Sequence, residues 1–185
     1  RTISLLNSMP VIRIKLSDLD ATQRFGGLLA SQLKVGDVIA LSGALGAGKS
    51  ALARAIIQAI DPTEDDVPSP TFTIVQHYAL ADGTPLWHLD LYRIDDARDA
   101  MALGLDDAFV DAVCLIEWPD RLKKFLPKTN LSIHLYEAET ADESYDTVYD
   151  AEPDSSVRFA DVTAPPHWAD RITGLVAAIS AGADT

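Results

Sequence analysis

The stretch Gly43-Ala44-Leu45-Gly46-Ala47-Gly48-Lys49-Ser50 decides how this chain folds, because it matches the phosphate-binding loop pattern G-x-x-x-x-G-K-[ST] in full. An apolar run at residues 38–41 precedes the loop and is typical of a strand buried on both faces. After the loop, apolar side chains recur at helical spacing, at Leu52, Ala55, Ile56, Ala59 and Ile60. The sequence therefore predicts a strand, a glycine loop and a helix that together bind a nucleoside triphosphate with its magnesium ion.

The residues of this loop have separate physical tasks in such a site. The glycines let backbone N–H groups approach phosphate oxygens, and the N-terminus of the following helix adds a favourable dipole. The Lys49 ammonium group would reach the β- and γ-phosphates, and the Ser50 hydroxyl would bind Mg²⁺. The alternative is a glycine-rich turn that only begins a helix.

The size and charge of the chain limit the classes of protein to which it can belong. Its 185 residues are expected to form one domain over residues 1–185. Its 28 acidic and 15 basic residues give a formal net charge of −13, which opposes tight, direct binding of nucleic-acid phosphates. The single cysteine, Cys114, excludes an internal disulfide and indicates a reducing, cytoplasmic compartment. No stretch reaches the length of a membrane span.

The remaining pattern predicts an α/β protein with a mixed sheet. Residues 11–16 alternate like an edge strand, and Ser17 or Asp18 follows as a helix cap. The turn Asp82-Gly83 joins β-rich stretches at 71–80 and 85–91, so the sheet must contain an antiparallel pair. With the phosphate loop, this gives a P-loop NTPase-like three-layer fold with a mixed, partly antiparallel central sheet.

Two features near the C-terminus lie outside this scheme. Residues 137–154 hold eight carboxylates and no Lys or Arg, and we interpret residues 137–161, approximately, as an acidic hairpin. A solvated surface without a partner is the simpler explanation of its charge. Beyond Pro165-Pro166, a helical stripe predicts a packing helix that closes the core, formed by Trp168, Ile172, Leu175, Val176 and Ile179.

Two acidic residues are candidates for the magnesium site. Asp90 and Glu117 each end a short apolar strand, where a nucleotide hydrolase needs an acid, and the pattern alone does not rank them. Thr71 would sense the γ-phosphate through the metal as part of a switch, or its loop is a proline-stiffened turn; the two interpretations have equal weight. Trp118 either stacks on a base or packs in the core. Three further aromatic side chains are predicted to be structural: His77, Trp87 and His88.

Four segments, in this order, resemble a known protein family. They are the phosphate loop, Ser69-Pro70-Thr71-Phe72, His88-Leu89-Asp90-Leu91-Tyr92-Arg93 and Ile116-Glu117-Trp118-Pro119-Asp120-Arg121. The set is similar to the bacterial TsaE (YjeE) family of ATPases over residues 17–137, approximately. That family belongs to the machinery that makes threonylcarbamoyladenosine (t6A) in tRNA.

The resemblance implies a Mg²⁺-dependent ATPase that is weak alone and acts on a complex of the proteins TsaB and TsaD. Those partners would hold the tRNA, so the chain would meet the nucleic acid only indirectly, through them. Because no stretch reaches the length of a membrane span, no membrane contact is expected. ATP would be bound by the loop at 43–50 and by Trp118. Oligomeric state does not follow from the resemblance.

The resemblance also implies roles for single residues and separates the two acids. Asp90 becomes the metal acid, and the Mg²⁺ site would consist of Ser50, Asp90 and Glu117. Lys49, Thr71 and Glu117 would be the catalytic residues, with Thr71 in the switch and Glu117 activating or positioning water. Ser50 stands where this family more often has Thr, a change that the loop pattern tolerates.

Three other functions are alternatives. A small-molecule kinase shares the loop, but arginines are scattered here and no lid-like insertion precedes the last predicted helix. A GTP-dependent switch protein needs Asn-Lys-x-Asp, and the nearest segment, Lys128-Thr129-Asn130, lacks the Asp. The third alternative is a module that binds nucleotide without turnover.

Overall fold

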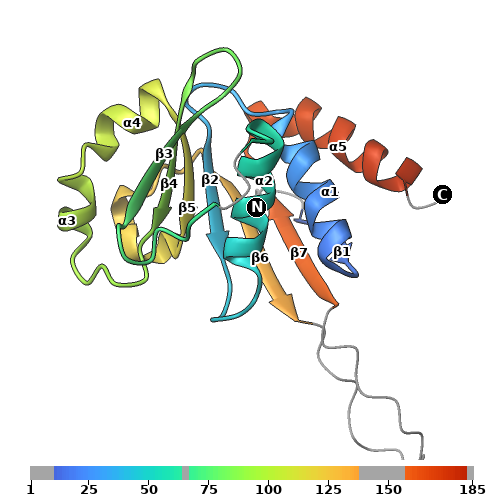
Figure 1. Ribbon diagram of the computed structural model, residues 1–185, viewed down its shortest axis with the longest axis horizontal. Coiled ribbons are helices and arrows are strands. Elements are labelled where there is room, and N and C mark those ends of the chain that lie inside the picture. Colours follow the sequence, from blue (N-terminus) through green and yellow to red (C-terminus); the bar gives the residue numbers. More distant parts are fainter. Residues whose placement is uncertain (1–10, 64–66, 138–156, 183–185) are drawn as a thin grey trace, which may run out of the picture.

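One seven-stranded mixed sheet organises the chain in the computed structural model, which describes residues 11–63, 67–137 and 157–182 (Figure 1). Its centre consists of four parallel strands, in the order β6 (Leu131–Glu137), β2 (Val38–Ser42), β5 (Val113–Glu117) and β4 (Pro85–Asp90). The residues of β5 are all buried, as expected of a parallel strand covered on both faces.

Antiparallel strands extend this parallel centre on both sides. β3 (Val75–Ala79) pairs with β4 across the Asp82-Gly83 turn, and β7 (Arg158–Thr163) lies between β6 and the edge strand β1 (Val11–Leu16). The predicted mixed sheet and α/β fold are therefore confirmed, as is the edge strand at residues 11–16.

Two helices pack side by side on one face of the sheet. They are α1 (Leu19–Ala30) and α2 (Lys49–Ile60), and Asp18 caps α1 by accepting a 2.7 Å hydrogen bond from the Ala21 N–H. Their buried side chains join those of the strands in one cluster, to which the C-terminal helix α5 (Ala169–Gly182) adds Ile172 and Leu175. Figure 1 shows α5 next to α1.

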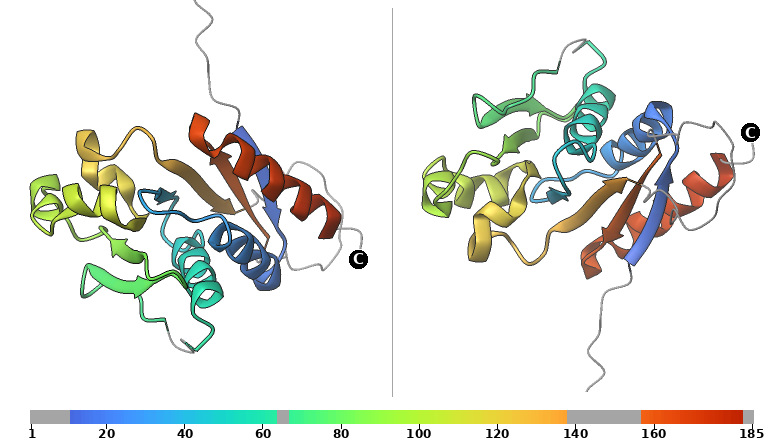
Figure 2. Two further views of the ribbon diagram at one scale, coloured as in Figure 1. Left: turned by 90° about the horizontal axis from the view of Figure 1, so that it is seen from above. Right: turned by 90° about the horizontal axis from the view of Figure 1, so that it is seen from below.

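The other face of the sheet is covered at the β4–β5 side by shorter helices. These are α3 (Ala97–Met101), α4 (Leu105–Asp111) and the 3₁₀ segment η1 (Pro119–Phe125), whose apolar side chains form a second cluster with Val38, Leu89 and Ile116. Figure 2 shows α3 and α4 well separated from α1 and α2. The predicted three layers are present, with the sheet between the two groups of helices.

Two expectations need comment. The strand predicted from residue 71 begins only at Val75, because a turn closed by the Ile74 N–H on the Pro70 carbonyl (2.6 Å) occupies the preceding residues. The acidic turn predicted within residues 137–161 falls on residues 138–156, which lie outside the described residues, so it stays a prediction. Among the described residues, no helix is long and apolar enough to span a membrane.

Candidate functional site

The carboxyl ends of three neighbouring strands bring the predicted site together. β2 runs into the phosphate loop, and the last residues of β4 and β5, Asp90 and Glu117, lie side by side in the register of the sheet. In open α/β sheets, ligands bind at this edge. A small cavity of about 260 Å³ opens there, lined by Leu45, Gly46, Gly48, Lys49, Ser50, Thr71, Asp90, Tyr92, Glu117 and Trp118.

The phosphate loop has a backbone that only glycine permits at two points. At Gly43 a Cβ atom would lie 2.3 Å from the Leu135 carbonyl oxygen, and Gly48 has a φ of +104° where α2 begins. The loop is folded around the Lys49 ammonium group, which donates to the carbonyl oxygens of Gly43 (2.8 Å) and Ala44 (2.6 Å). Together these features form the concave cradle that phosphate oxygens require.

Lys49 is the buried positive charge of the site, with only 5% of the residue exposed. Burial lowers its pKa, and the nearby carboxylates Glu117 and Asp90 act in the opposite direction. The ammonium group also lies 4.0 Å from the centroid of the Trp118 ring, a cation–π contact. A cation held at the base of a glycine loop is poised to bind an anion.

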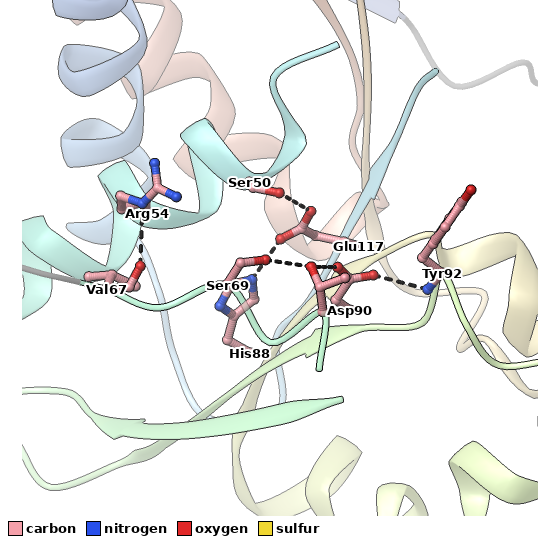
Figure 3. A network of polar contacts seen from close by, with 9 residues as sticks. Ser50, Arg54, Val67, Ser69, His88, Asp90, Tyr92 and Glu117 are labelled. Atoms are coloured by element: carbon pink, nitrogen blue, oxygen red, sulfur yellow. Dashed lines mark hydrogen bonds and ion pairs between the residues drawn. The ribbon is translucent and has the colours of Figure 1, made fainter. Parts of the chain in front are cut away.

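Glu117 connects the loop to the interior of the sheet (Figure 3). Its Oε2 accepts a hydrogen bond from the Ser50 hydroxyl at 2.6 Å, and its Oε1 lies 2.9 Å from Nε2 of His88. Only 1% of Glu117 is exposed. Because a buried carboxylate is costly unless its oxygens are hydrogen-bonded, these two contacts allow an acid at this position.

Asp90 makes a second hydroxyl–carboxylate pair beside the first. The Thr71 hydroxyl donates to its Oδ2 at 2.7 Å, and the Tyr92 N–H donates to its Oδ1 at 3.0 Å. The hydroxyl of Ser69 lies 2.7 Å from that of Thr71. The loop that follows α2 is thus tied to the strand end, with Ile74 in the left-handed region (φ 68°), which is rare for a β-branched residue.

The chemistry of these groups fits a magnesium ion. Mg²⁺ prefers oxygen ligands and is usually held by one or two carboxylates together with substrate phosphates. Two hydroxyls and two carboxylates converge beside the phosphate loop, from Ser50, Thr71, Asp90 and Glu117. Over the described ranges, no three His, Cys, Asp or Glu side chains cluster as a metal site built from protein alone would need.

The structure brings every sequence-predicted site residue to this cavity or its loop, including Trp118, whose backbone is left-handed (φ 59°) directly after Glu117. Two neighbours were not predicted: Tyr92, whose ring lies 5.0 Å from that of Trp118, and His88, which contacts Glu117. The alternation in β4 carries a signal for His88, because it shares a buried face with Asp90 where an apolar residue is usual.

A larger cavity of about 560 Å³ lies elsewhere, between β1, α1 and α5. Its lining is mainly apolar with three cations, Arg13, Lys15 and Arg24, and the described residues that line it include no carboxylate and no glycine. It therefore lacks the groups that the predicted chemistry needs.

Comparisons with known proteins point to one family. The family profile described as "Threonylcarbamoyl adenosine biosynthesis protein TsaE" matches residues 16–145. The chain is 40% identical over 116 residues to the tRNA threonylcarbamoyladenosine biosynthesis protein TsaE of Bacillus subtilis, covering 62% of this chain and 70% of that protein. It is 37% identical to the protein of the same name from Haemophilus influenzae, covering 53% and 61%.

A solved structure has the same architecture over nearly the whole chain. The crystal structure of Bacillus subtilis YdiB superposes with a TM-score of 0.66 at 26% identity, covering 91% of this chain and 95% of that one. The Mycobacterium tuberculosis protein named TsaE is 38% identical over 128 residues, 65% of this chain and 76% of its own length. The matched family profile spans the phosphate loop, both strand-end acids and Trp118, so this chain belongs to the TsaE family.

Proposed function

We propose that this chain is a Mg²⁺-dependent ATPase that serves t6A biosynthesis by acting on a complex of TsaB and TsaD. The observation that carries the proposal is the pairing of two hydroxyls with two strand-end carboxylates beside the phosphate loop: Ser50 with Glu117, and Thr71 with Asp90. Oxygen donors of this kind suit a magnesium ion shared with the phosphates of ATP.

In this proposal the residues divide the work of hydrolysis. The backbone of residues 43–50 and the Lys49 ammonium group bind the phosphates and offset negative charge that develops on them. Ser50 and Asp90 would hold Mg²⁺, which when bound neutralises phosphate charge, with Thr71 responding to the nucleotide state. Glu117, whose Oε2 accepts the Ser50 hydroxyl at 2.6 Å, would orient the attacking water and accept its proton. It would also contribute to the metal site.

The proposal extends to partners and location. Curated relatives at 37–40% identity carry the name of t6A biosynthesis. A formal net charge of −13 disfavours direct tRNA binding, so the tRNA would be held by TsaB and TsaD. The place of action would be the cytoplasm. Two large apolar side chains, Leu45 and Phe72, are about four-fifths exposed on the two loops that line the cavity, where a partner protein would cover them.

Steady-state ATP hydrolysis tests the proposal, measured for the chain alone and with TsaB and TsaD from the same organism. We expect the pair to stimulate turnover strongly, and Glu117→Ala to lower it about 100-fold or more while ATP still binds. Asp107→Asn, which removes an exposed carboxylate on α4, is the matched control and should behave like the wild type.

Two results would count against the proposal in different ways. ATP binding without stimulation by the pair would leave the nucleotide site standing but reject the role in t6A biosynthesis. Full turnover by Glu117→Ala would move the water-activating role to another residue.

A further inference from the structure

A histidine lies behind the proposed water-activating carboxylate. His88 is 2% exposed and lies on β4, beside β5, which ends in Glu117. Its Nε2 is 2.9 Å from Oε1 of Glu117, while Oε2 of the same carboxylate accepts the Ser50 hydroxyl. The three side chains form a line that runs from the interior of the sheet to the phosphate loop (Figure 3).

The hydrogen-bond pattern assigns the tautomer of the ring. A carboxylate oxygen accepts, so the proton between the two groups belongs to Nε2 of His88, which donates to Glu117. Nδ1 then carries a lone pair, and it is buried with no hydrogen-bond partner among the described residues. A buried acceptor without a partner is more easily tolerated than a buried N–H without one.

Among the described residues, only Glu117 forms a hydrogen bond with the His88 ring. Gln76, its register partner on β3, donates to the Thr73 hydroxyl instead. On the same face of β4, Leu86 lies two residues before His88, and Leu115 is its register partner on β5; both are fully buried. An apolar residue at position 88 would suit this environment better, because it would bury no polar atom. The one feature that a histidine adds is the Nε2–H aimed at Glu117.

We infer that His88 is a positioning residue for Glu117, an inference that rests on the proposed ATPase function. Its N–H fixes Oε1, so the carboxylate cannot rotate freely and Oε2 stays directed at Ser50 of the phosphate loop. Both residues belong to paired strands, which hold side chains more precisely than loops do. Without this bond Oε1 is a buried oxygen without a donor, and the carboxylate would turn towards another one, such as Lys49.

Two substitutions at this position separate positioning from packing. His88→Leu fills the space but removes the donor, and we expect kcat to fall about 10- to 100-fold with little change in the Kd for ATP, the range typical of residues that orient a primary ligand. His88→Gln places an amide N–H near the position of Nε2 and should recover most of the loss. Thermal unfolding of both variants, measured in parallel, reports whether either change is one of stability.

A purely structural role predicts another outcome, in which kcat follows the melting temperature and glutamine gives no recovery. That result would overturn the inference. In a Glu117→Ala background, His88→Leu should lower the residual rate no further, because the residue through which His88 acts is gone. The inference would also be overturned if His88→Leu lowered the rate of the Glu117→Ala variant by the same factor as it lowers the rate of the wild type.

A spectroscopic measurement on the nucleotide-free chain does not depend on activity. In ¹⁵N-edited NMR of the histidine side chains, His88 should show a protonated Nε2 and an unprotonated Nδ1, and Glu117→Gln should shift the Nε2 signal. Protonation at Nδ1 alone would contradict the inference. If Glu117→Ala retains full turnover, the proposed function fails instead; if Glu117→Ala is inactive while His88→Leu turns over normally, only the present inference fails.

Discussion

Glu117 has 1% of its surface exposed, yet each of its carboxylate oxygens has a hydrogen-bond partner. One partner, Ser50, belongs to the phosphate loop, and the other, His88, belongs to the neighbouring strand. The positive charge of Lys49 is close enough to act on it as well. A buried acid therefore depends on groups from two other segments, the phosphate loop and β4, which explains why its local sequence alone did not distinguish it from Asp90.

Lys49→Ala should weaken ATP binding about 10- to 150-fold, because charged hydrogen bonds are worth about 1.5–3 kcal/mol. The ammonium group is buried, and Lys49 is the one lysine or arginine among the described residues that line the cavity. Isothermal titration calorimetry with Mg²⁺-ATP measures the change. Lys128→Ala, at an exposed lysine, serves as the control, and equal affinities of the two variants would refute the site.

Cys114 should not react with iodoacetamide at pH 8 in the folded protein. Its thiol is fully buried in β5, and burial raises its pKa to about 12, so it carries almost no thiolate. The same shift makes the folded state lose stability as the pH rises from about 9 towards 12, since the unfolded thiol ionises first. Mass spectrometry should detect alkylation only after denaturation, and rapid labelling of the native chain would contradict this prediction.

The packing of α1 on α2 depends on one glycine. A Cβ atom at Gly26 would lie 2.6 Å from the Ala55 Cβ and 2.9 Å from its carbonyl carbon. Gly26→Ala should therefore destabilise the protein, because overpacking costs about 1–3 kcal/mol and outweighs the gain in helix propensity. Urea unfolding measures the change in the free energy of unfolding.

The adjacent Gly27 provides the matched comparison. Its Cβ would meet only the Ala59 Cβ at 4.0 Å, so Gly27→Ala should stabilise the helix by about 0.4–1 kcal/mol. Equal effects of the two substitutions would show that the contact between α1 and α2 is not limited by the size of residue 26.

Elements were predictable from the sequence where local rules apply. The phosphate loop, the Asp82-Gly83 hairpin and the short apolar strands all follow from spacing and turn chemistry, and each lies where it was expected. The extent of β3 was not predictable, because the Pro70–Ile74 turn depends on a hydrogen bond and a left-handed Ile74. The sequence predicts a structural role for His88. Its contact with Glu117, 29 residues away, was not predictable, because the register between two strands does not follow from the sequence of either strand alone.

On the scale of the whole molecule, the candidate site lies at the edge of the sheet where β2, β4 and β5 end. α2 begins at that edge with the phosphate loop, while the apolar clusters on the two faces keep β2, β4 and β5 in register. The geometry of the candidate site thus depends on the sheet as a unit. A contact at the opposite end of β2 should matter for stability and leave nucleotide chemistry largely unaffected.

Arg171 provides such a contact, because it ties α5 to the start of β2. Its guanidinium donates to both carboxylate oxygens of Asp37 (2.6 and 2.9 Å) and to the Gln32 carbonyl, with 11% and 4% of the two charged side chains exposed. Arg171→Ala removes the bidentate cation from the buried Asp37, which keeps the Lys34 N–H at 2.8 Å and His167 Nε2 at 3.9 Å, and should cost about 3–5 kcal/mol in the free energy of unfolding. For a chain of this size, the melting temperature would fall by about 6–20 °C.

The exposed pair Arg98 and Asp96 is the control for this experiment. Arg98 lowers the pKa of Asp96 to about 2, yet both groups face solvent, so Arg98→Ala should hardly change the melting temperature. ATP affinity of Arg171→Ala, measured well below its melting temperature, should equal that of the wild type, because Arg171 lies at the far end of the strand from the loop. A loss of affinity at full folding would show instead that α5 takes part in shaping the phosphate loop, and equal melting temperatures of the two arginine variants would show that α5 is not held by this pair.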